Sequence, residues 1–226
     1  MLGIIGAMDV EVDAIKALIQ SPAVKTAAGL EFVSGRIENT EVCAVRCNPG
    51  KVNAALCTQL MLDLYDIEKV INLGVGCSLN ENVVIKDVVV ATGVCQYDFD
   101  TSAVDGVKGL IIDGKTAIAA DKELSDALAK AAEKAGARVH RGVIATGDCF
   151  IASDELKRSI VEDFGAVCGE MEGGAIGQVC YINKVPFAVL RCVSDGGDSS
   201  VQIDYPTFKP IAAEQSARAI INFLKQ

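Results

Sequence analysis

The chain has 226 residues, with 30 acidic and 21 basic side chains and a formal net charge of −9. This balance argues against proteins that bind nucleic acid backbones or anionic membrane surfaces, so we expect neither as a partner. The single histidine, His140, disfavours a Ser-His-Asp hydrolase and a multi-histidine metal centre. Half of the residues are hydrophobic, so much apolar surface must be buried in a core or between subunits.

Short β-rich runs alternate with longer runs of helical periodicity along the chain. The predicted strands cover residues 1–7, 31–47 (a meander or hairpin around Asn39 and Thr40), 69–75, 87–97, 138–147, 166–172 and 185–195. The predicted helices cover residues 8–20, 50–65, 121–135, 153–165, 173–183 and 207–225, and the glycine-punctuated residues 98–117 form an unassigned loop. The alternation predicts an α/β fold: one domain over residues 1–226, a three-layer sandwich with a mixed, mostly parallel central sheet.

Nine cysteines are spread through apolar runs, and no pair has CxxC spacing. An odd number of cysteines in such surroundings indicates reduced thiols that serve as small hydrophobic residues. Reduced thiols favour a cytoplasmic location. The N-terminal residues lack the basic leader of a secretory signal, and no apolar run approaches the roughly 20 residues that a membrane-spanning helix needs.

Acidic residues follow several of the predicted strands. They are Glu11, Asp148, Glu170, Glu172 and Asp195. Ligands of open α/β sheets bind beyond the carboxyl ends of the strands, so we expect these side chains to gather at one edge, near Arg191. Like charges raise one another's pKa, so such a cluster is costly unless it serves acid/base catalysis, hydroxyl recognition or metal binding.

Each candidate also has a purely structural interpretation. Glu11 lies in a first helical turn, where the helix dipole favours any acid, and Asp148 fits a turn or a cap. The Gly74-x-Gly76 spacing is more typical of a tight turn than of a phosphate cradle. His140 is expected at the surface. Glu172 and Asp195 are the hardest to explain structurally, because both follow strands that should be buried.

Four motifs carry a resemblance to a known family: GAMDVEV at 6–12, TGDCFI at 146–151, EMEGGAI at 170–176 and RCVSD at 191–195. In this order they resemble the 5′-methylthioadenosine/S-adenosylhomocysteine nucleosidases of the purine nucleoside phosphorylase superfamily. The resemblance implies an α/β sandwich homodimer that hydrolyses the N-glycosidic bond of 5′-thioadenosines and releases adenine, with a role in methionine salvage. It implies a small purine nucleoside as substrate and neither a metal nor another cofactor.

The resemblance also implies roles for individual residues. Asp195 would protonate adenine at N7 with support from Ser194. Glu11 would act as general base on a water, and Arg191 would help Glu11 as an orienting residue. The implied substrate contacts are Met8, Phe150, Ile151, Glu170, Met171, Glu172 and Tyr205. Among these, Glu172 would hold the ribose hydroxyls, Met171 would pack under the sugar, Phe150 would stack on the purine, and the Ile151 backbone would read its edge. A protonated Asp195 near neutral pH requires a desolvated, apolar surround.

The sequence departs from the family pattern near the expected sugar site. Val75-Gly76-Cys77-Ser78 replaces a serine followed by Ala-Gly-Gly, which removes a hydroxyl near the ribose. Residues 47–51 and 97–100 also differ, the loop that follows is shorter, and Tyr205 stands where the family usually has Phe. In relatives this loop reaches the neighbouring subunit's pocket for the 5′ substituent.

Two other functions stay open at the level of sequence. The same scaffold could use phosphate in place of water, with Arg36 or Arg46 as anion ligands, although Glu11 would repel a dianion. A non-catalytic nucleoside-binding homologue is the second alternative. The preferred 5′ group, whether methylthio, homocysteinyl, 5′-deoxy or futalosine-like, is not determined by the sequence.

Overall fold

A mixed ten-stranded sheet forms the centre of the protein in the computed structural model, which describes residues 1–225. Its strands are β1 (Leu2–Gly6), β2 (Gln20–Ala27), β3 (Leu30–Ile37), β4 (Thr40–Arg46), β5 (Lys69–Ser78), β6 (Val88–Gln96), β7 (Ile118–Ala119), β8 (Val139–Thr146), β9 (Ala166–Glu170) and β10 (Phe187–Asp195). Strands β1, β4 and β5 run parallel, whereas β2, β3 and β4 form an antiparallel meander. The α/β class and the mixed sheet are as predicted, with a larger antiparallel share than expected.

Part of the sheet closes into a ring. Strand β5 pairs with β10, β10 with β6, β6 with β8, β8 with β9, and β9 again with β5. The long strand β5 makes this closure possible, because it also pairs with β1 and so joins the ring to the open part of the sheet. The ends of β5, β8, β9 and β10, which are distant in sequence, are thereby brought around one small space.

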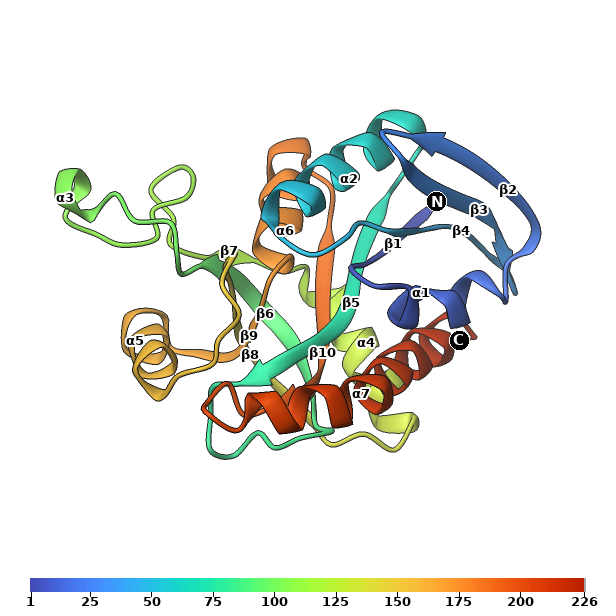
Figure 1. The fold of residues 1–226 in the computed structure, drawn as a ribbon. Coiled ribbons are helices and arrows are strands. Elements are labelled where there is room, and N and C mark those ends of the chain that lie inside the picture. The colour runs from blue at the N-terminus through green and yellow to red at the C-terminus, as the bar shows by residue number, and fades with distance from the viewer. Residues whose placement is uncertain (226) are drawn as a thin grey trace.

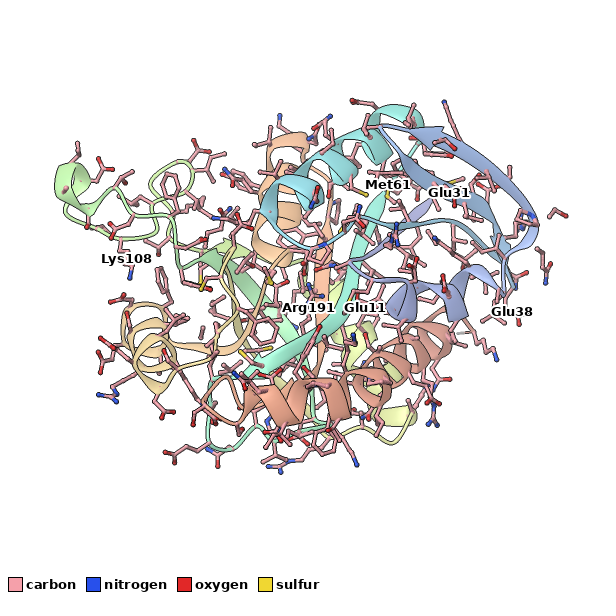
Figure 2. All side chains as sticks on the ribbon, viewed as in Figure 1. Glu11, Glu31, Glu38, Met61, Lys108 and Arg191 are labelled. Atoms are coloured by element: carbon pink, nitrogen blue, oxygen red, sulfur yellow. The ribbon has the colours of Figure 1, made fainter. Side chains whose placement is uncertain are left out.

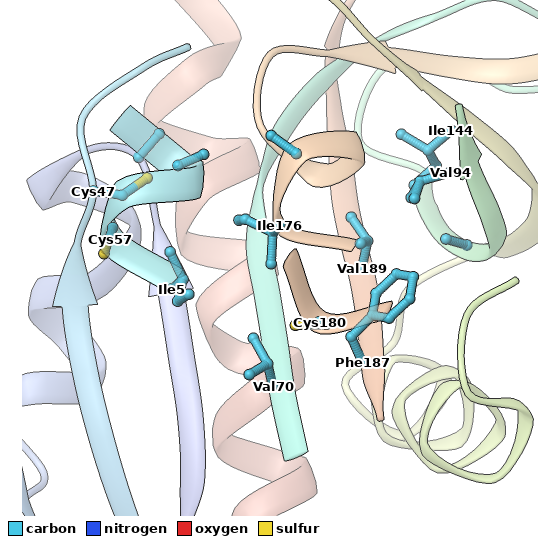
Figure 3. Packing of buried hydrophobic residues seen from close by; sticks show 14 of the residues in the cluster. Ile5, Cys47, Cys57, Val70, Val94, Ile144, Ile176, Cys180, Phe187 and Val189 are labelled. Carbon is cyan, nitrogen blue, oxygen red and sulfur yellow. The ribbon is translucent and has the colours of Figure 1, made fainter. Parts of the chain in front are cut away.

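Helices cover both faces of the sheet (Figure 1). They are α1 (Asp9–Lys16), α2 (Lys51–Leu64), α3 (Ser102–Asp105), α4 (Lys122–Lys134), α5 (Asp154–Phe164), α6 (Gly173–Asn183) and α7 (Val201–Leu224). Helices α2 and α6 pack together on one face, while α7 packs on α1, α4 and β10 on the other. Figure 3 shows the hydrophobic cluster on the first of these faces, which includes Ile5 of β1, Val70 of β5 and Ile176 of α6. Burial of each such side chain contributes about 1.5–3 kcal/mol, so the apolar faces fix the layers.

Several boundaries follow from local chemistry as predicted. The Ser153 hydroxyl accepts the backbone N–H of Leu156 at 3.3 Å and caps α5. Gly136, with φ +86°, follows the end of α4 in a conformation that glycine adopts without strain. The expected hairpin is formed by β3 and β4, with Ile37 opposite Thr40.

The structure corrects three predicted elements. Helix α1 ends at Lys16 rather than at residue 20, and β2 follows as a strand that the pattern did not predict. Strand β2 pairs only with β3 and is exposed along nearly its whole length, so it lacks the apolar alternation by which strands are recognised. Helix α7 begins at Val201 rather than at 207, because Pro206 and Pro210 lie inside it instead of ending it.

Two further expectations concern the loop 98–117 and His140. The unassigned loop 98–117 contains α3 and projects from the body of the protein (Figure 1). His140 is partly buried rather than fully exposed, because its Nε2 lies 2.8 Å from Asp87 Oδ2. Over the described part of the chain, no helix has both the length and the apolar character needed to cross a membrane.

Candidate active site

A cavity of about 280 Å³ opens at the rim of the strand ring. Its walls come from the residues after β1, the end of β5, the segment after β8, the end of β9 and the end of β10. The predicted site residues that line it are Met8, Glu11, Phe150, Ile151, Glu170, Met171, Glu172, Ser194, Asp195 and Tyr205. The fold therefore brings together ten of the predicted residues, and Arg191 lies buried behind them.

Glu11 is a buried carboxyl group held by the main chain. Its Oε2 accepts the N–H groups of Ala7 at 2.7 Å and Met8 at 2.9 Å, and its Oε1 accepts the N–H of Val75 at 3.1 Å. Burial raises its pKa above the ordinary value, although the positive charge of Arg191 and these hydrogen bonds oppose the rise. A fixed carboxylate with a raised pKa has the properties of a general base.

Gly74 and Gly76 lie inside β5, not in the predicted tight turn. A Cβ on Gly74 would come within 2.7 Å of Glu11 Oε1 and 3.3 Å of an Arg191 Nη atom. A Cβ on Gly76 would come within 2.8 Å of both Cys168 Sγ and the Gly169 carbonyl oxygen. The two glycines are therefore required by close packing under the cavity floor rather than by a turn.

Arg191 is buried to 1% exposure at the centre of several acidic groups, and Figure 2 shows it next to Glu11. Its Nη2 donates to Glu170 Oε2 and, at 2.6 Å, to Asn72 Oδ1, and it lies 3.5 Å from Glu172 Oε2. Within residues 1–225 no hydrogen bond or ion pair joins it to Glu11. The predicted orienting role is therefore corrected: backbone N–H groups orient Glu11, and Arg191 acts on it through charge alone.

Glu170 is an anchor for this arginine. Its Oε1 accepts the Thr146 hydroxyl, and its Oε2 accepts the N–H groups of Glu172 at 3.0 Å and Gly173 at 2.7 Å as well as Arg191. Four protein donors already occupy the carboxylate, so the geometry does not support the predicted substrate contact. Glu170 instead fixes Arg191 below the cavity.

Glu172 lies between Arg191 and the start of α2. Its Oε1 accepts the Gly50 N–H at 3.1 Å. Burial raises the pKa of Glu172, and the negative charge of Glu170 raises it further. The exposed side of this carboxylate faces the cavity and can accept hydroxyl donors from a ligand.

Asp195 ends β10 and is buried to 1% exposure, as the sequence-based argument required. Its Oδ2 accepts the Ser194 hydroxyl at 2.8 Å, and its Oδ1 accepts the Gly197 N–H at 3.0 Å. Burial is the largest cause of its raised pKa, and the charges of Asp204 and Asp198 add to the effect. A carboxyl group whose proton is favoured in this way can serve as a general acid.

Aromatic rings form the outer wall. Phe150 and Tyr205 meet edge to face, with ring centroids 5.0 Å apart and planes at 81°. Tyr205 Oη lies 3.7 Å from Met8 Sδ across the mouth of the cavity. Carboxylates at the base and aromatic rings at the mouth suit a ligand with a hydroxylated part and a flat apolar part.

Sequence reasoning missed several supporting residues. Asn72 binds Arg191, and Thr146 binds Glu170; an asparagine within the apolar run KVINLGV is the signal that marks the first. Pro49, Cys77 and Cys149 also line the cavity, although the cysteines were interpreted as ordinary core residues.

Most of the remaining candidates have structural roles. Asp148 accepts the Lys51 N–H at 2.8 Å at the start of α2, as a capping role predicts. All nine cysteines are free, and eight are buried. No group of three potential metal ligands is found in the part of the chain that the structure describes.

Comparison with known proteins places the chain in a family. The family model described as the phosphorylase superfamily matches residues 1–225. A 5′-methylthioadenosine/S-adenosylhomocysteine nucleosidase of Haemophilus influenzae is 36% identical over 224 residues, which cover 99% of this chain and 98% of the relative.

Solved structures agree with the sequence relatives. A 5′-methylthioadenosine/S-adenosylhomocysteine nucleosidase of Neisseria meningitidis, in complex with methylthio-immucillin-A, superposes with a TM-score of 0.95 at 29% identity, covering 99% of this chain and 98% of that one. A futalosine hydrolase of Helicobacter pylori gives a TM-score of 0.94 at 32% identity, covering 99% of this chain and 97% of that one. The resemblance inferred from the four motifs is confirmed: the chain belongs to the phosphorylase superfamily and, within it, to the 5′-methylthioadenosine/S-adenosylhomocysteine nucleosidases.

Proposed function

We propose that this protein hydrolyses the N-glycosidic bond of 5′-thioadenosines, such as 5′-methylthioadenosine and S-adenosylhomocysteine, and releases adenine. The observation that carries the proposal is the pair Glu11 and Asp195. Both are buried carboxyl groups with raised pKa values, and both line one cavity, yet their hydrogen bonds come from different segments. Cleavage of a glycosidic bond needs such a pair, one to protonate the leaving group and one to activate water.

Asp195 supplies the proton to the leaving base. Its carboxyl O–H donates to N7 of adenine, and the bond between N9 and C1′ of the ribose breaks with its electron pair remaining on the base. The Ser194 Oγ lies 2.8 Å from Asp195 Oδ2 and 3.3 Å from the Gly76 carbonyl oxygen. It can therefore donate to the carbonyl while Asp195 is protonated and to the carboxylate once the proton has left.

Glu11 activates the attacking water. Its carboxylate takes a proton from the water while the water oxygen bonds to C1′, so the products are adenine and a free 5-thioribose sugar. Glu172 accepts hydrogen bonds from the ribose hydroxyls, and Met171 packs below the ring. The developing positive charge on the sugar is stabilised by the carboxylates at this end of the cavity, which are fixed before the reaction starts.

The base occupies the other end of the cavity. We place it against Phe150, with the backbone of Ile151 pairing with its N1 and 6-amino edge. Tyr205 covers the mouth, where its ring already contacts Phe150. Stacking on an aromatic ring is favourable for any purine base and does not select among purines. The selectivity for adenine must therefore come from the hydrogen bonds of Asp195 and of the Ile151 backbone.

Phosphorolysis is the less favoured reaction. Among the described residues that line the cavity there is no lysine or arginine. Arg46 is paired with Asp9 at 2.6 Å, and Arg36 lies 3.8 Å from Glu41, both outside the cavity. A phosphate dianion would meet Glu11 and Glu172, and the buried cation behind them, Arg191, already pairs with Glu170 and Glu172.

Adenine release from 5′-methylthioadenosine tests the proposal directly. We expect the same rate in phosphate-free buffer and in buffer with added phosphate, and a free sugar rather than a sugar phosphate as the second product. Glu11→Gln serves as the background control. Strict dependence on phosphate would establish a phosphorylase instead, and tight binding of the nucleoside without adenine release would establish a binding protein.

The 5′ group is the part of the substrate for which the cavity residues give the weakest selectivity. Val75 lines the cavity where the family pattern has a serine, so the wall near the ribose is apolar here. A thioether fits an apolar wall better than a charged side chain does, which supports 5′-methylthioadenosine as the main substrate. The futalosine hydrolase among the structural relatives makes a futalosine-type nucleoside the necessary comparison substrate.

We further propose that the protein acts in the cytoplasm, in methionine salvage, as a single domain over residues 1–226 that pairs into a homodimer. Its free cysteines suit a reducing compartment. Large apolar side chains are exposed on two helices that pack together: Val52 at 79% on α2 and Ile182 at 58% on α6. A second copy that covers these helices would remove that surface from water.

Light scattering at micromolar concentration tests the dimer. The expected mass is twice the 23.7 kDa of one chain. Val52→Glu should shift the mass toward that of one chain, because it would place a charge inside the proposed interface. A wild-type protein with the mass of a single chain would contradict the dimer.

A further inference from the structure

The thiol of Cys77 occupies a distinctive position at the base end of the cavity. Cys77 lines the cavity and is only 6% exposed. Its Cα is paired with that of Asp195 where β5 and β10 lie side by side. The negative charge of Asp195 contributes to the raised pKa of the thiol, so the sulfur and the carboxylate are electrostatic neighbours. The Cys77 side chain therefore lies next to Asp195, the group that we propose as proton donor to the leaving base.

Three further segments enclose the same sulfur. A Cβ on Gly169 would lie 2.9 Å from Cys77 Sγ, and a Cβ on Gly197 would lie 3.0 Å from it. Side-chain atoms of Ile151 border both of these positions. The absence of a side chain at Gly169 and Gly197 thus leaves the space that the thiol fills, and Cys77 and Ile151 pack closely against these two glycines.

This position corresponds to one corner of the base. In adenine, the 6-amino group lies between N7 and N1. The proposed function places N7 at Asp195 and N1 at the Ile151 backbone. Cys77 is paired with Asp195 across β5 and β10, and its Sγ borders the same two glycines as the Ile151 side chain. A side chain at this corner faces whatever atoms are attached to the 6-position.

We propose that Cys77 is a specificity-determining residue that closes the cavity at the 6-amino corner and excludes adenines with a substituent on that nitrogen. This inference rests on the proposed function, because the orientation of the base comes from it. The effect is one of volume. Burial keeps the thiol protonated, so it is not a nucleophile, and the sulfur acts through the space that it occupies.

Binding of the free bases measures the effect without turnover. Calorimetry would give the ratio of Kd values for N6-methyladenine and adenine with the wild type and with Cys77→Ser, Cys77→Ala and Cys77→Gly. One methyl group in a closed pocket is worth about 10–200-fold in discrimination. We expect the wild type to bind adenine at least about 10-fold more tightly than N6-methyladenine, and Cys77→Ser to keep this ratio of Kd values. Cys77→Ala and then Cys77→Gly should lower the ratio progressively, by about 10-fold or more.

Two controls make the result specific. Cys168→Ala removes the thiol that packs against Gly76 outside the cavity lining, and it should leave the ratio unchanged. Discrimination against 2-methyladenine should be the same in all variants, because the 2-position lies at the far side of N1. An unchanged N6-methyl ratio in both Cys77→Ala and Cys77→Gly, no preference in the wild type, or relief at the 2-position instead would each overturn the inference.

The two proposals fail in different ways. A protein that releases adenine from 5′-methylthioadenosine, but whose selectivity does not respond to Cys77, retains the proposed function and loses this inference. A protein that does not bind adenine loses both.

Discussion

Replacing Asp195 by asparagine is expected to lower kcat for adenine release by about 10²–10⁴-fold, the usual contribution of a general acid. The asparagine keeps the shape of the side chain and can still pair with Ser194, so KM should change far less than kcat. Asp63→Asn is the matched control. Asp63 is exposed on α2, outside the cavity lining, and its Oδ1 accepts the Gln59 side-chain N–H at 2.9 Å. The assay is adenine release under saturating substrate.

The pH dependence distinguishes loss of a proton donor from general damage. Burial raises the Asp195 pKa, and the group must hold its proton, so the rate should fall as pH rises through that pKa. Glu11 must be ionised, and its pKa is also raised, so the rate should fall as pH drops through the Glu11 pKa. Asp195→Asn should lose the alkaline limb and keep the acidic one. A variant that retains more than about a tenth of the wild-type kcat would contradict the assignment.

Arg191→Met is expected to have the largest effect on stability, about 3–5 kcal/mol in the free energy of unfolding. The substitution removes the cation shared by Glu170, Glu172 and Glu11 and leaves these carboxylates buried without a counter-charge. It also leaves the Asn72 oxygen without the donor that lies 2.6 Å away. Urea unfolding at neutral pH measures the loss.

Arg141→Met is the matched control for this experiment. Arg141 pairs with Asp126 at 3.0 Å, but both side chains are about one-third exposed, and such surface pairs contribute about 0–1 kcal/mol. The loss in Arg191→Met should shrink as pH is lowered, because Glu172 and Glu11 already have raised pKa values and protonation removes their charge. A loss of less than about 1 kcal/mol would show that the arginine is dispensable for folding.

The sequence was most informative where chemistry is local. Glu11, Glu172 and Asp195 stand at or just after the carboxyl ends of short apolar strands, which the sequence pattern reveals. Their convergence could be inferred because ligands of open α/β sheets bind beyond the carboxyl ends of the strands. The helix cap at Ser153 was equally predictable from the sequence. In each case the signal lies within a few residues of the feature.

The parts that were missed depend on contacts distant in sequence. The pairing of β5 with β10 joins residues more than a hundred positions apart, and it is this pairing that puts Arg191 beside Gly74. Nothing near Arg191 in the sequence shows that Glu170 and Asn72, rather than Glu11, will be its partners. The sequence pattern missed strand β2 for another reason. Strand β2 is an exposed edge strand that contains Pro22, so it has no hydrophobic face by which it could be recognised.

The ring formed by β5, β10, β6, β8 and β9 has a consequence for how the ligand exchanges with solvent. Each strand of the ring is hydrogen-bonded on both sides, so the strands cannot spread to let adenine leave. Exchange must instead depend on side chains at the mouth, where the Phe150 ring rests edge-on against Tyr205. We therefore expect the base to leave through the gap that opens when these two rings part, rather than between the strands.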